Sequence, residues 1–550
     1  MVSMASTPCG TPLTPTTTNS SLRRKPSAAF DVPGLTRSRA SPDGLCNTID
    51  TKLLIVMVGL PARGKSYITK KICRYMNWQR YKTRIFNVGN TRRSNCENNN
   101  DSAPVSAESE SQTTHSAEFF DPNNDKSIQM REKWAMDTLD ELLDFLIHGD
   151  GCIGLFDATN TSVARRRKII NHVRERTDGK LKILFVESIC DNDAIIQKNV
   201  HLKLSGPDYK NVDKEVALQD FLGRMKNYEK VYETIQESEE TSEIQYIKLI
   251  NVGKKVIMYN VNGFLSEQVV GFLMNFNLAE RQIWISRAAE SESEAQDRLG
   301  GDSPVTAAGH GYAEAAARFI SQQKSAFFAD QVEHLVVQAQ EDGTPLAPVL
   351  SNLQESSFSV WTSMNCSAIE TGAHFDDSVF DVKAMKMLNE LNYGSFEGLT
   401  LSEIQRSYPY EYNAQITNGE RYKYPGSGGE SYLDVINRVR PVVLELERMV
   451  DNSLIISHPI MCQALLAYFL NLDSTNSFEV PANTLFSVQR KPYGVEWEAY
   501  QYDASIDSFV KLDTTSDISI VATPQHRPPT GSDTLASVVA GPMVPSLMNA

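Results

Sequence analysis

Paired cysteines, long apolar runs and an excess of positive charge are all missing from this sequence of 550 residues. Its eight cysteines are scattered singly, with no Cys-x-x-Cys pair, which argues against a zinc or disulfide framework and favours a reducing compartment. No apolar run approaches the roughly 18 residues that a membrane span requires. The net charge of −14 argues against nucleic acid or an anionic membrane as the main partner. We therefore expect a cytoplasmic protein with no nucleic-acid and no membrane partner.

The two ends of the chain differ in composition from the rest. Residues 1–48 are rich in Ser, Thr and Pro without an apolar period, and residues 506–550 turn similar, so we expect mostly disordered tails. Ser27 and Ser41 follow basic residues, a pattern that basic-directed protein kinases recognise. A solvated tail with incidental charges explains that pattern equally well. Residues 94–116 are rich in Asn, Ser and Glu, and we expect them to form a solvated insertion.

The most informative stretch is an apolar run, residues 53–58, that leads into a glycine-rich loop. The loop reads Gly59-Leu60-Pro61-Ala62-Arg63-Gly64-Lys65-Ser66-Tyr67 and has the spacing of a phosphate loop. Its glycines let backbone N–H groups surround a polyphosphate, Lys65 can reach the outer phosphates, and the Ser66 hydroxyl can ligate Mg²⁺. Apolar residues at helical spacing follow the loop. An apolar strand before the loop and an amphipathic helix after it are the context that the motif requires.

Strand-like and helix-like segments alternate along the chain, which predicts two α/β domains, the first with a doubly wound parallel sheet. We place the domains at residues 49–280 and 281–505. In the first we expect strands at 53–58, 84–88, 152–156, 183–187, 246–250 and 256–261, and a helix at 127–147. In the second we expect strands at 283–286, 335–338, 358–361 and 454–457, and helices near 402–406 and 432–450. Asp157 directly follows an expected strand, where a carboxylate can hold Mg²⁺ or orient a substrate hydroxyl.

Further motifs follow the phosphate loop in a fixed order. They are Phe86-Asn-Val-Gly89 with Arg92-Arg93, Phe156-Asp-Ala-Thr-Asn160, Phe185-Val-Glu-Ser-Ile-Cys190 and Pro207-Asp-Tyr209. With them the chain closely resembles the 6-phosphofructo-2-kinase/fructose-2,6-bisphosphatase family over about residues 50–500. The resemblance implies a P-loop kinase-like domain followed by a histidine-phosphatase, phosphoglycerate mutase-like domain. It also implies transfer of the γ-phosphoryl group of ATP, with Mg²⁺, to the 2-hydroxyl of fructose 6-phosphate. The product would be fructose 2,6-bisphosphate, a regulator of glycolysis.

The resemblance also implies roles for particular residues. Residues 59–67 and Lys198 fall on nucleotide-binding positions, and Ser66 and Asp157 on metal-binding ones. Lys65, Asp157, Cys190 and Lys203 fall on catalytic positions. The sugar-phosphate positions are occupied by Arg92, Arg131, Thr159, Arg165, Lys203, Arg224 and Tyr228. Guanidinium groups bind phosphate oxygens in pairs, which suits this substrate. A cysteine at the end of an apolar strand is most often plain packing. Asn90-Thr91 and Lys198 depart from the family pattern, and we expect altered affinity rather than lost activity.

The second domain departs from the family pattern where phosphatase chemistry needs it. The strand that normally ends in Arg-His-Gly ends here in Arg287-Ala288-Ala289, so the nucleophilic histidine is missing. Glu294 replaces a phosphate-binding asparagine, and Ser367 and Gln463 replace arginines. The general-acid position Glu390 and the second histidine, His458, remain. Losing the nucleophile costs several powers of ten in rate, and each lost charge-assisted contact costs roughly 1.5–3 kcal/mol. We therefore expect an inactive phosphatase-like domain.

Two alternatives stay open on the sequence alone. One is a bifunctional enzyme with residual phosphatase activity that does not use position 288. The other is a non-catalytic protein that binds nucleotide or sugar phosphate and acts through its tails. The intact Lys65, Ser66 and Asp157 count against the second alternative. A homodimer is compatible with the sequence.

Overall fold

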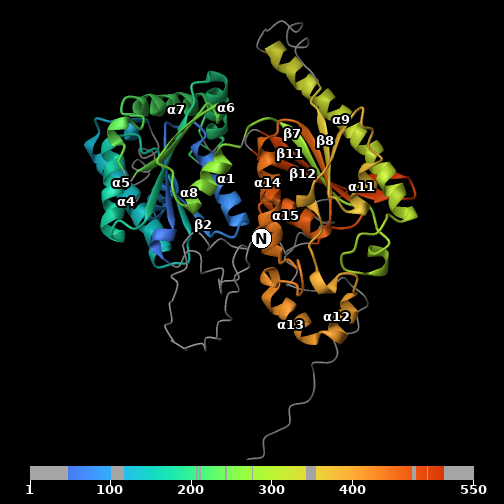
Figure 1. Cartoon of the computed structure of the whole chain (residues 1–550). Helices are drawn as coiled ribbons and strands as arrows, with labels where there is room; N and C mark the ends of the chain where they lie inside the picture. The colour runs from blue at the N-terminus through green and yellow to red at the C-terminus, as the bar shows by residue number, and fades with distance from the viewer. Residues whose placement is uncertain are drawn as a thin grey trace, which may run out of the picture.

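The computed structural model describes residues 48–512, apart from 101–116, 206–207, 210–211, 242–243, 276, 342–354, 473–478 and 492–493. These residues form two α/β lobes, each built on its own sheet (Figure 1). Most of both predicted tails, with Ser27 and Ser41, and most of the predicted insertion lie outside the described residues. Residues 508–511, expected to lie in the C-terminal tail, instead form the strand β13. Residues 94–100, expected to begin that insertion, instead continue the helix α2, Val88–Asn100.

The first sheet has six strands in the order β2-β3-β1-β4-β5-β6. They are β1 Leu53–Val58, β2 Thr83–Asn87, β3 Ile153–Asp157, β4 Lys182–Ile189, β5 Gln245–Ile250 and β6 Lys255–Tyr259. All neighbours are parallel except β5 and β6, which are antiparallel. The predicted strands of this domain are confirmed to within about three residues at either end. Because β1 lies between β3 and β4, the loop after β1 and Asp157 at the end of β3 meet at one edge of the sheet.

Helices cover both faces of this sheet. They are α1 Lys65–Trp78, α2, α4 Asp125–Ile147, α5 Val163–Thr177, α6 Asp193–Leu204, α7 Lys214–Glu229 and α8 Phe264–Leu273. Successive side chains of a strand point to opposite faces. Leu53, Ile55 and Met57 accordingly pack in one core with α1 and α8, whereas the alternate residues of β1 pack with α4 and α5. This two-sided burial explains why β1 is apolar throughout.

The second sheet has seven strands in the order β13-β12-β11-β7-β10-β8-β9. They are β7 Arg281–Arg287, β8 Phe358–Thr362, β9 Asp381–Ala384, β10 Asn452–Ser457, β11 Thr484–Lys491, β12 Gly494–Asp503 and β13 Ser508–Lys511. The strands β7, β10, β8 and β9 are parallel, and β11 to β13 are antiparallel additions at one edge. The helices are α9 Ala307–Glu341, α11 Cys366–Gly372, α12 Leu401–Ser407, α13 Pro409–Asn418, α14 Tyr432–Arg448 and α15 Pro459–Leu470.

One predicted strand of this domain is wrong. Residues 335–338 lie in α9, which extends well beyond the lobe in Figure 1. The run Leu335-Val336-Val337 has the composition of a strand. However, Val332, Leu335, Val336 and Ala339 recur at helical spacing, and that longer period decides the structure.

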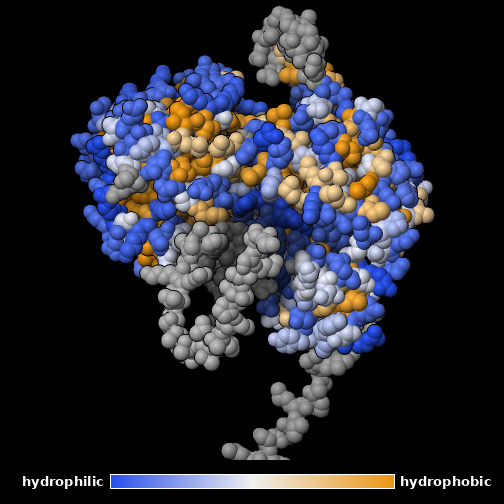
Figure 2. All heavy atoms as spheres, viewed as in Figure 1, coloured by the Kyte–Doolittle hydropathy of each residue, from blue (hydrophilic) through white to orange (hydrophobic). Residues whose placement is uncertain are grey.

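The two lobes share one hydrophobic core. Tyr75 and Trp78 of α1 belong to the same buried cluster as Tyr468 and Phe469 of α15. The Trp78 indole Nε1 donates a hydrogen bond to the Ala464 carbonyl at 2.9 Å. Figure 2 shows a mostly hydrophilic face on which hydrophobic residues form separate patches, as expected when the large apolar side chains are inside. No helix of the described part of the chain is long and apolar enough to cross a membrane.

Candidate active site

The phosphate loop connects the end of β1 to the first turn of α1. Gly59 and Gly64 have φ angles of +135° and +84°, which L side chains rarely adopt. A Cβ at Gly59 would lie 2.5 Å from the Ser188 carbonyl oxygen. Ser188 Oγ donates to the Arg63 carbonyl at 2.5 Å, and Asn199 Nδ2 donates to the Ala62 carbonyl at 2.9 Å. These contacts fix the loop ahead of a helix N-terminus, the end of a helix at which an anion is favoured.

Lys65, Ser66 and Asp157 line one cavity of about 730 Å³. Lys65 Nζ donates to the Leu60 carbonyl at 2.5 Å, and Asp157 accepts a hydrogen bond from Asn87 Nδ2 of β2 at 2.6 Å. Burial lowers the pKa of Lys65 to about 7, while the nearby Asp157 acts in the opposite direction. An ammonium, a hydroxyl and a carboxylate thus converge at the end of the loop.

The hydroxyl oxygen of Ser66 and the carboxylate oxygens of Asp157 are suitable ligands for Mg²⁺. Among the described residues, no group of three or more His, Cys, Asp and Glu side chains gathers as a metal site. Mg²⁺ does not require one, because it is commonly held by one or two protein oxygens together with phosphate oxygens and water. Ser66 and Asp157 supply two such oxygens in the cavity.

All the predicted sugar-phosphate residues line this cavity. They are Arg92, Arg131, Thr159, Arg165, Lys203, Arg224 and Tyr228. The lining holds eight lysines and arginines against three carboxylates, although the whole chain carries a net charge of −14. The cavity is therefore the place where an anionic substrate finds charge complementarity.

Asp208 holds part of this cationic set in place. Its carboxylate accepts hydrogen bonds from Arg92 at 2.8 Å, Arg93 at 2.9 Å and Arg224 at 3.3 Å. Burial acts to raise the pKa of Asp208, but Arg92 and Arg224 outweigh burial and hold that pKa below its usual range. Arg165 pairs in a similar way with Glu132. Single carboxylates thus orient several guanidinium groups without neutralising the site.

Sequence reasoning missed Phe120, which organises three of the arginines. The guanidinium carbons of Arg224, Arg92 and Arg131 lie 3.9, 5.5 and 5.7 Å from the centre of its ring. Phe120 ends the short 3₁₀ helix Ala117–Phe120, which is tied to α7 by a hydrogen bond from the Ala117 N–H to Asp220 at 2.6 Å. The signal available in the sequence was an aromatic pair, Phe119-Phe120, directly after a polar segment.

Five residues predicted for this site lie outside the cavity lining, two of them away from the phosphate loop. Cys190 follows β4, is buried, and has its Sγ 3.9 Å from the Asn192 carbonyl oxygen. Lys198 is exposed on α6, with its ammonium 4.0 Å from the Glu280 carboxylate. The loop residues Gly59, Leu60 and Arg63 also do not line the cavity, although they shape the loop that does.

The phosphatase positions of the second lobe are paired with side chains and a backbone carbonyl of the same lobe. Arg287 forms an ion pair with Glu294 and donates to the Val480 carbonyl at 3.0 Å. His458 Nε2 lies 2.7 Å from Ser363 Oγ, and its Nδ1 lies 3.7 Å from Glu390. Burial lowers the pKa of His458 to about 3 and raises the pKa of Glu390 to about 8. Ala288 follows β7 and offers no nucleophile.

Residues 43–280 match the family model described as 6-phosphofructo-2-kinase, and residues 341–502 match the histidine phosphatase superfamily (branch 1). The relative named 6-phosphofructo-2-kinase 1 of Saccharomyces cerevisiae is 46% identical over 90% of this chain. The chain spans 57% of the length of that yeast relative. The relative named 6-phosphofructo-2-kinase/fructose-2,6-bisphosphatase of Caenorhabditis elegans is 37% identical over 84% of this chain and 91% of its own length.

Among solved structures, mycobacterial hydrolase 1 is 20% identical, with a TM-score of 0.29, and is matched over 40% of this chain and 95% of its own. The two family models follow one another in the order that the sequence motifs predicted. The resemblance and the predicted fold class are thereby confirmed. On the extent of the match to the nematode relative, the chain belongs to the 6-phosphofructo-2-kinase/fructose-2,6-bisphosphatase family.

Proposed function

We propose that the chain is a 6-phosphofructo-2-kinase that transfers the γ-phosphoryl group of ATP to O2 of fructose 6-phosphate. The observation that carries the proposal is the single cavity that Lys65, Ser66 and Asp157 share with the seven sugar-phosphate residues. One pocket with a phosphate loop and a separate cationic wall suits a reaction between two phosphorylated substrates. The product, fructose 2,6-bisphosphate, makes the chain a regulator of glycolysis, and we infer a cytoplasmic site of action.

The chemistry divides among the chain's own residues. Lys65 stabilises charge on the outer phosphates, and the Arg92, Arg131 and Arg224 group binds the 6-phosphate of the sugar. Asp157 orients the attacking 2-hydroxyl, and Lys203, which lines the same cavity, offsets charge on the transferring group. Ser66 and Asp157 would hold Mg²⁺, which supplies charge neutralisation at the phosphates. Cys190 and Lys198 lie outside the lining, so we assign them no step.

We further propose that the second lobe is inactive as a phosphatase. Position 288 has no nucleophile, and the Arg287 guanidinium that would meet a phosphate is paired with Glu294. The bifunctional alternative would require a different nucleophile. The low pKa of His458 leaves that residue neutral at physiological pH, so it would not add positive charge to bind phosphate.

A single assay tests the function. Purified full-length chain is supplied with ATP, Mg²⁺ and fructose 6-phosphate, and the position of the new phosphate is determined by ³¹P and ¹³C NMR. We expect phosphate on O2. Phosphate on O1 would contradict the substrate assignment, and nucleotide binding without any product would favour the non-catalytic alternative.

A further inference from the structure

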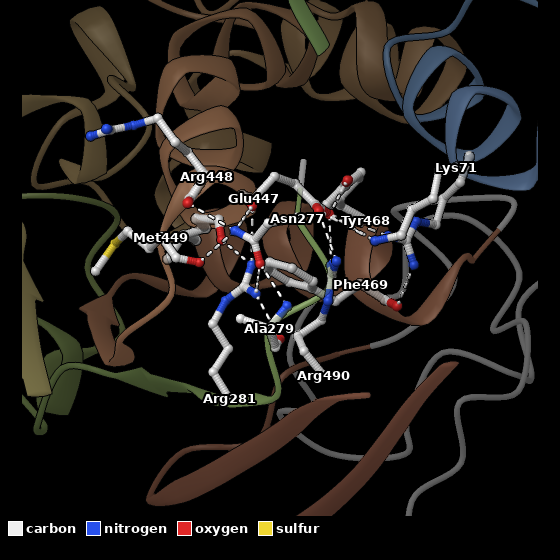
Figure 3. Close-up of polar contacts among 12 residues, drawn as sticks. Lys71, Asn277, Ala279, Arg281, Glu447, Arg448, Met449, Tyr468, Phe469 and Arg490 are labelled. Carbon is white, nitrogen blue, oxygen red and sulfur yellow. Dashed lines mark hydrogen bonds and ion pairs between the residues drawn. The ribbon is translucent and has the colours of Figure 1, made fainter. Parts of the chain in front are cut away.

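A buried carboxylate of the second lobe contacts the helix that begins at the phosphate loop. Glu447, in the last turn of α14, is 0% exposed. Lys71 lies 3.3 Å from both of its carboxylate oxygens, and Arg74 lies 3.4 Å from one of them. Arg490 of β11 donates to the two oxygens at 2.7 and 2.8 Å, and the Tyr468 hydroxyl donates at 2.5 Å. Figure 3 shows Lys71, Tyr468 and Arg490 around the Glu447 side chain.

These five residues, which we call the Glu447 cluster, fix one side of α1. Lys71, Arg74 and Trp78 recur at spacings of three and four and therefore share one helical face. A neighbouring face, with Ile68 and Ile72, belongs to the hydrophobic core that includes β1 of the first sheet. Within its own lobe, α1 is tied to β2 near its C-terminal end, where Asn77 donates to the Thr83 carbonyl at 2.9 Å and accepts from the Thr83 N–H at 2.8 Å. The Glu447 cluster and the Trp78 hydrogen bond to Ala464 add directional contacts from the second lobe along the middle of α1 and at its end.

Glu447 is itself held in place. Arg281 donates to the Leu446 and Glu447 carbonyls at 2.7 and 3.2 Å. Asn277 donates to the Glu447 and Met449 carbonyls, both at 3.0 Å. Asn277 lies in the segment that joins the lobes, and Arg281 begins β7. Both satisfy carbonyls at the C-terminal end of α14, where the Arg281 cation is also favourable. Burial would raise the pKa of Glu447, but Lys71 and Arg490 hold it well below its usual range.

We infer that Glu447 is a positioning residue for the phosphate loop, so that the phosphatase-like lobe is a working part of the kinase. Lys65 and Ser66 occupy the first turn of the same helix whose second and third turns carry Lys71 and Arg74. The direction of α1 sets where its N-terminal N–H groups and the Lys65 ammonium meet the triphosphate. Without the Glu447 charge, Lys71, Arg74 and Arg490 would remain buried around a neutral centre, and α1 would shift to hydrate them.

The inference rests on the proposed kinase function but is tested on nucleotide binding alone. In the full-length chain, Glu447→Gln keeps the shape of the side chain and removes its charge. We expect the dissociation constant for MgATP, measured by calorimetry without sugar, and the KM for ATP to rise at least ten-fold. The KM for fructose 6-phosphate should change less than two-fold. A merely structural role would lower thermal stability without this split between the two substrates.

The matched control is Glu430→Gln. Glu430 lies in the same lobe and forms a two-point pair with Arg438 at 2.9 and 2.9 Å, but that pair does not include α1. Loss of the Glu430–Arg438 pair should leave the dissociation constant for MgATP unchanged. In addition, Glu447→Gln should weaken MgATP binding less in a Lys71→Met background than in the wild type, because the two residues act as a pair.

A folded Glu447→Gln variant that binds MgATP within two-fold of the wild type would overturn the inference. If that variant does not fold, Arg74→Met, whose side chain is at the edge of the cluster and 12% exposed, carries the same prediction. An unchanged MgATP affinity there would overturn it equally. A wild-type chain that binds MgATP but makes no fructose 2,6-bisphosphate would refute the proposed function. The effect of Glu447→Gln on the MgATP dissociation constant would still test the inference in that case.

Discussion

Replacing Phe120 with leucine should weaken fructose 6-phosphate binding selectively. The aromatic face attracts guanidinium groups, and each such contact contributes roughly 0.5–2 kcal/mol, the upper value when the pair is desolvated. Arg224, at 3.9 Å, makes the closest of the three contacts, and Phe120 is only 4% exposed. We take the loss as about 1.5 kcal/mol, dominated by this contact. That corresponds to about a ten-fold rise in the KM for fructose 6-phosphate, with the KM for ATP unchanged.

Steady-state kinetics with each substrate varied in turn measure the effect, and Phe119→Leu is the control. Phe119 is equally buried at 6% exposure and packs against Trp134 at 5.9 Å between ring centres, so its truncation removes the same volume from the same cluster. Both variants should lose similar thermal stability. If both raise the KM for fructose 6-phosphate alike, or if Phe120→Leu raises the two KM values together, the ring does not organise the arginines and the reasoning is refuted.

Three further predictions concern the two sites. Lys65→Ala or Asp157→Ala should lower product formation by roughly three powers of ten, because both residues act on charge in phosphoryl transfer. Circular dichroism should show that both variants retain the fold. Rates near that of the wild type would contradict the assignment of these residues. Because the pKa of Lys65 is lowered to about 7 and a bound triphosphate favours the ammonium form, MgATP binding should take up a proton above pH 7 and weaken as pH rises. Calorimetry in buffers of different ionisation enthalpy measures this uptake, which Lys65→Arg should abolish. Incubation with fructose 2,6-bisphosphate labelled in the 2-phosphate should leave no label on the protein. Ala288→His alone should not restore phosphatase turnover, because Glu294 still pairs with Arg287. Transfer of the label to the wild-type protein would establish the bifunctional alternative.

The candidate site of the first lobe was largely predictable because most of its residues lie in short consecutive motifs. A phosphate loop uses neighbouring residues on one strand, loop and helix, and a strand buried on both faces is apolar throughout. Asp157 was identifiable for a similar reason, since the ends of parallel strands meet at one edge. The ordered arginines followed from the family resemblance, and the structure places all of them on one cavity.

The contacts that sequence reasoning missed join residues far apart in the chain. Lys71 and Glu447 are separated by 376 positions, and a glutamate near the end of an amphipathic helix ordinarily faces solvent. Phe120 was missed because an aromatic residue beside a polar segment carries no motif of its own. Cys190 and Lys198 were assigned from family positions, and only the fold reveals that neither lines the cavity. In each case the deciding information is which side chains the tertiary structure brings together.

The second sheet separates the phosphatase positions of the second lobe from the residues that contact α1. Ala288 and His458 follow the C-terminal ends of the parallel strands β7 and β10. Arg281 begins β7 and pairs in register with Arg490, so the Glu447 cluster lies at the opposite edge of the sheet. A strand of seven residues separates the two edges by about 20 Å, and substitutions so far apart without shared partners act independently. We therefore expect changes at Ala288, Glu294 and Ser367 to leave α1 undisturbed, whereas a change at Glu447 would act on the phosphate loop through Lys71 and Arg74 of α1.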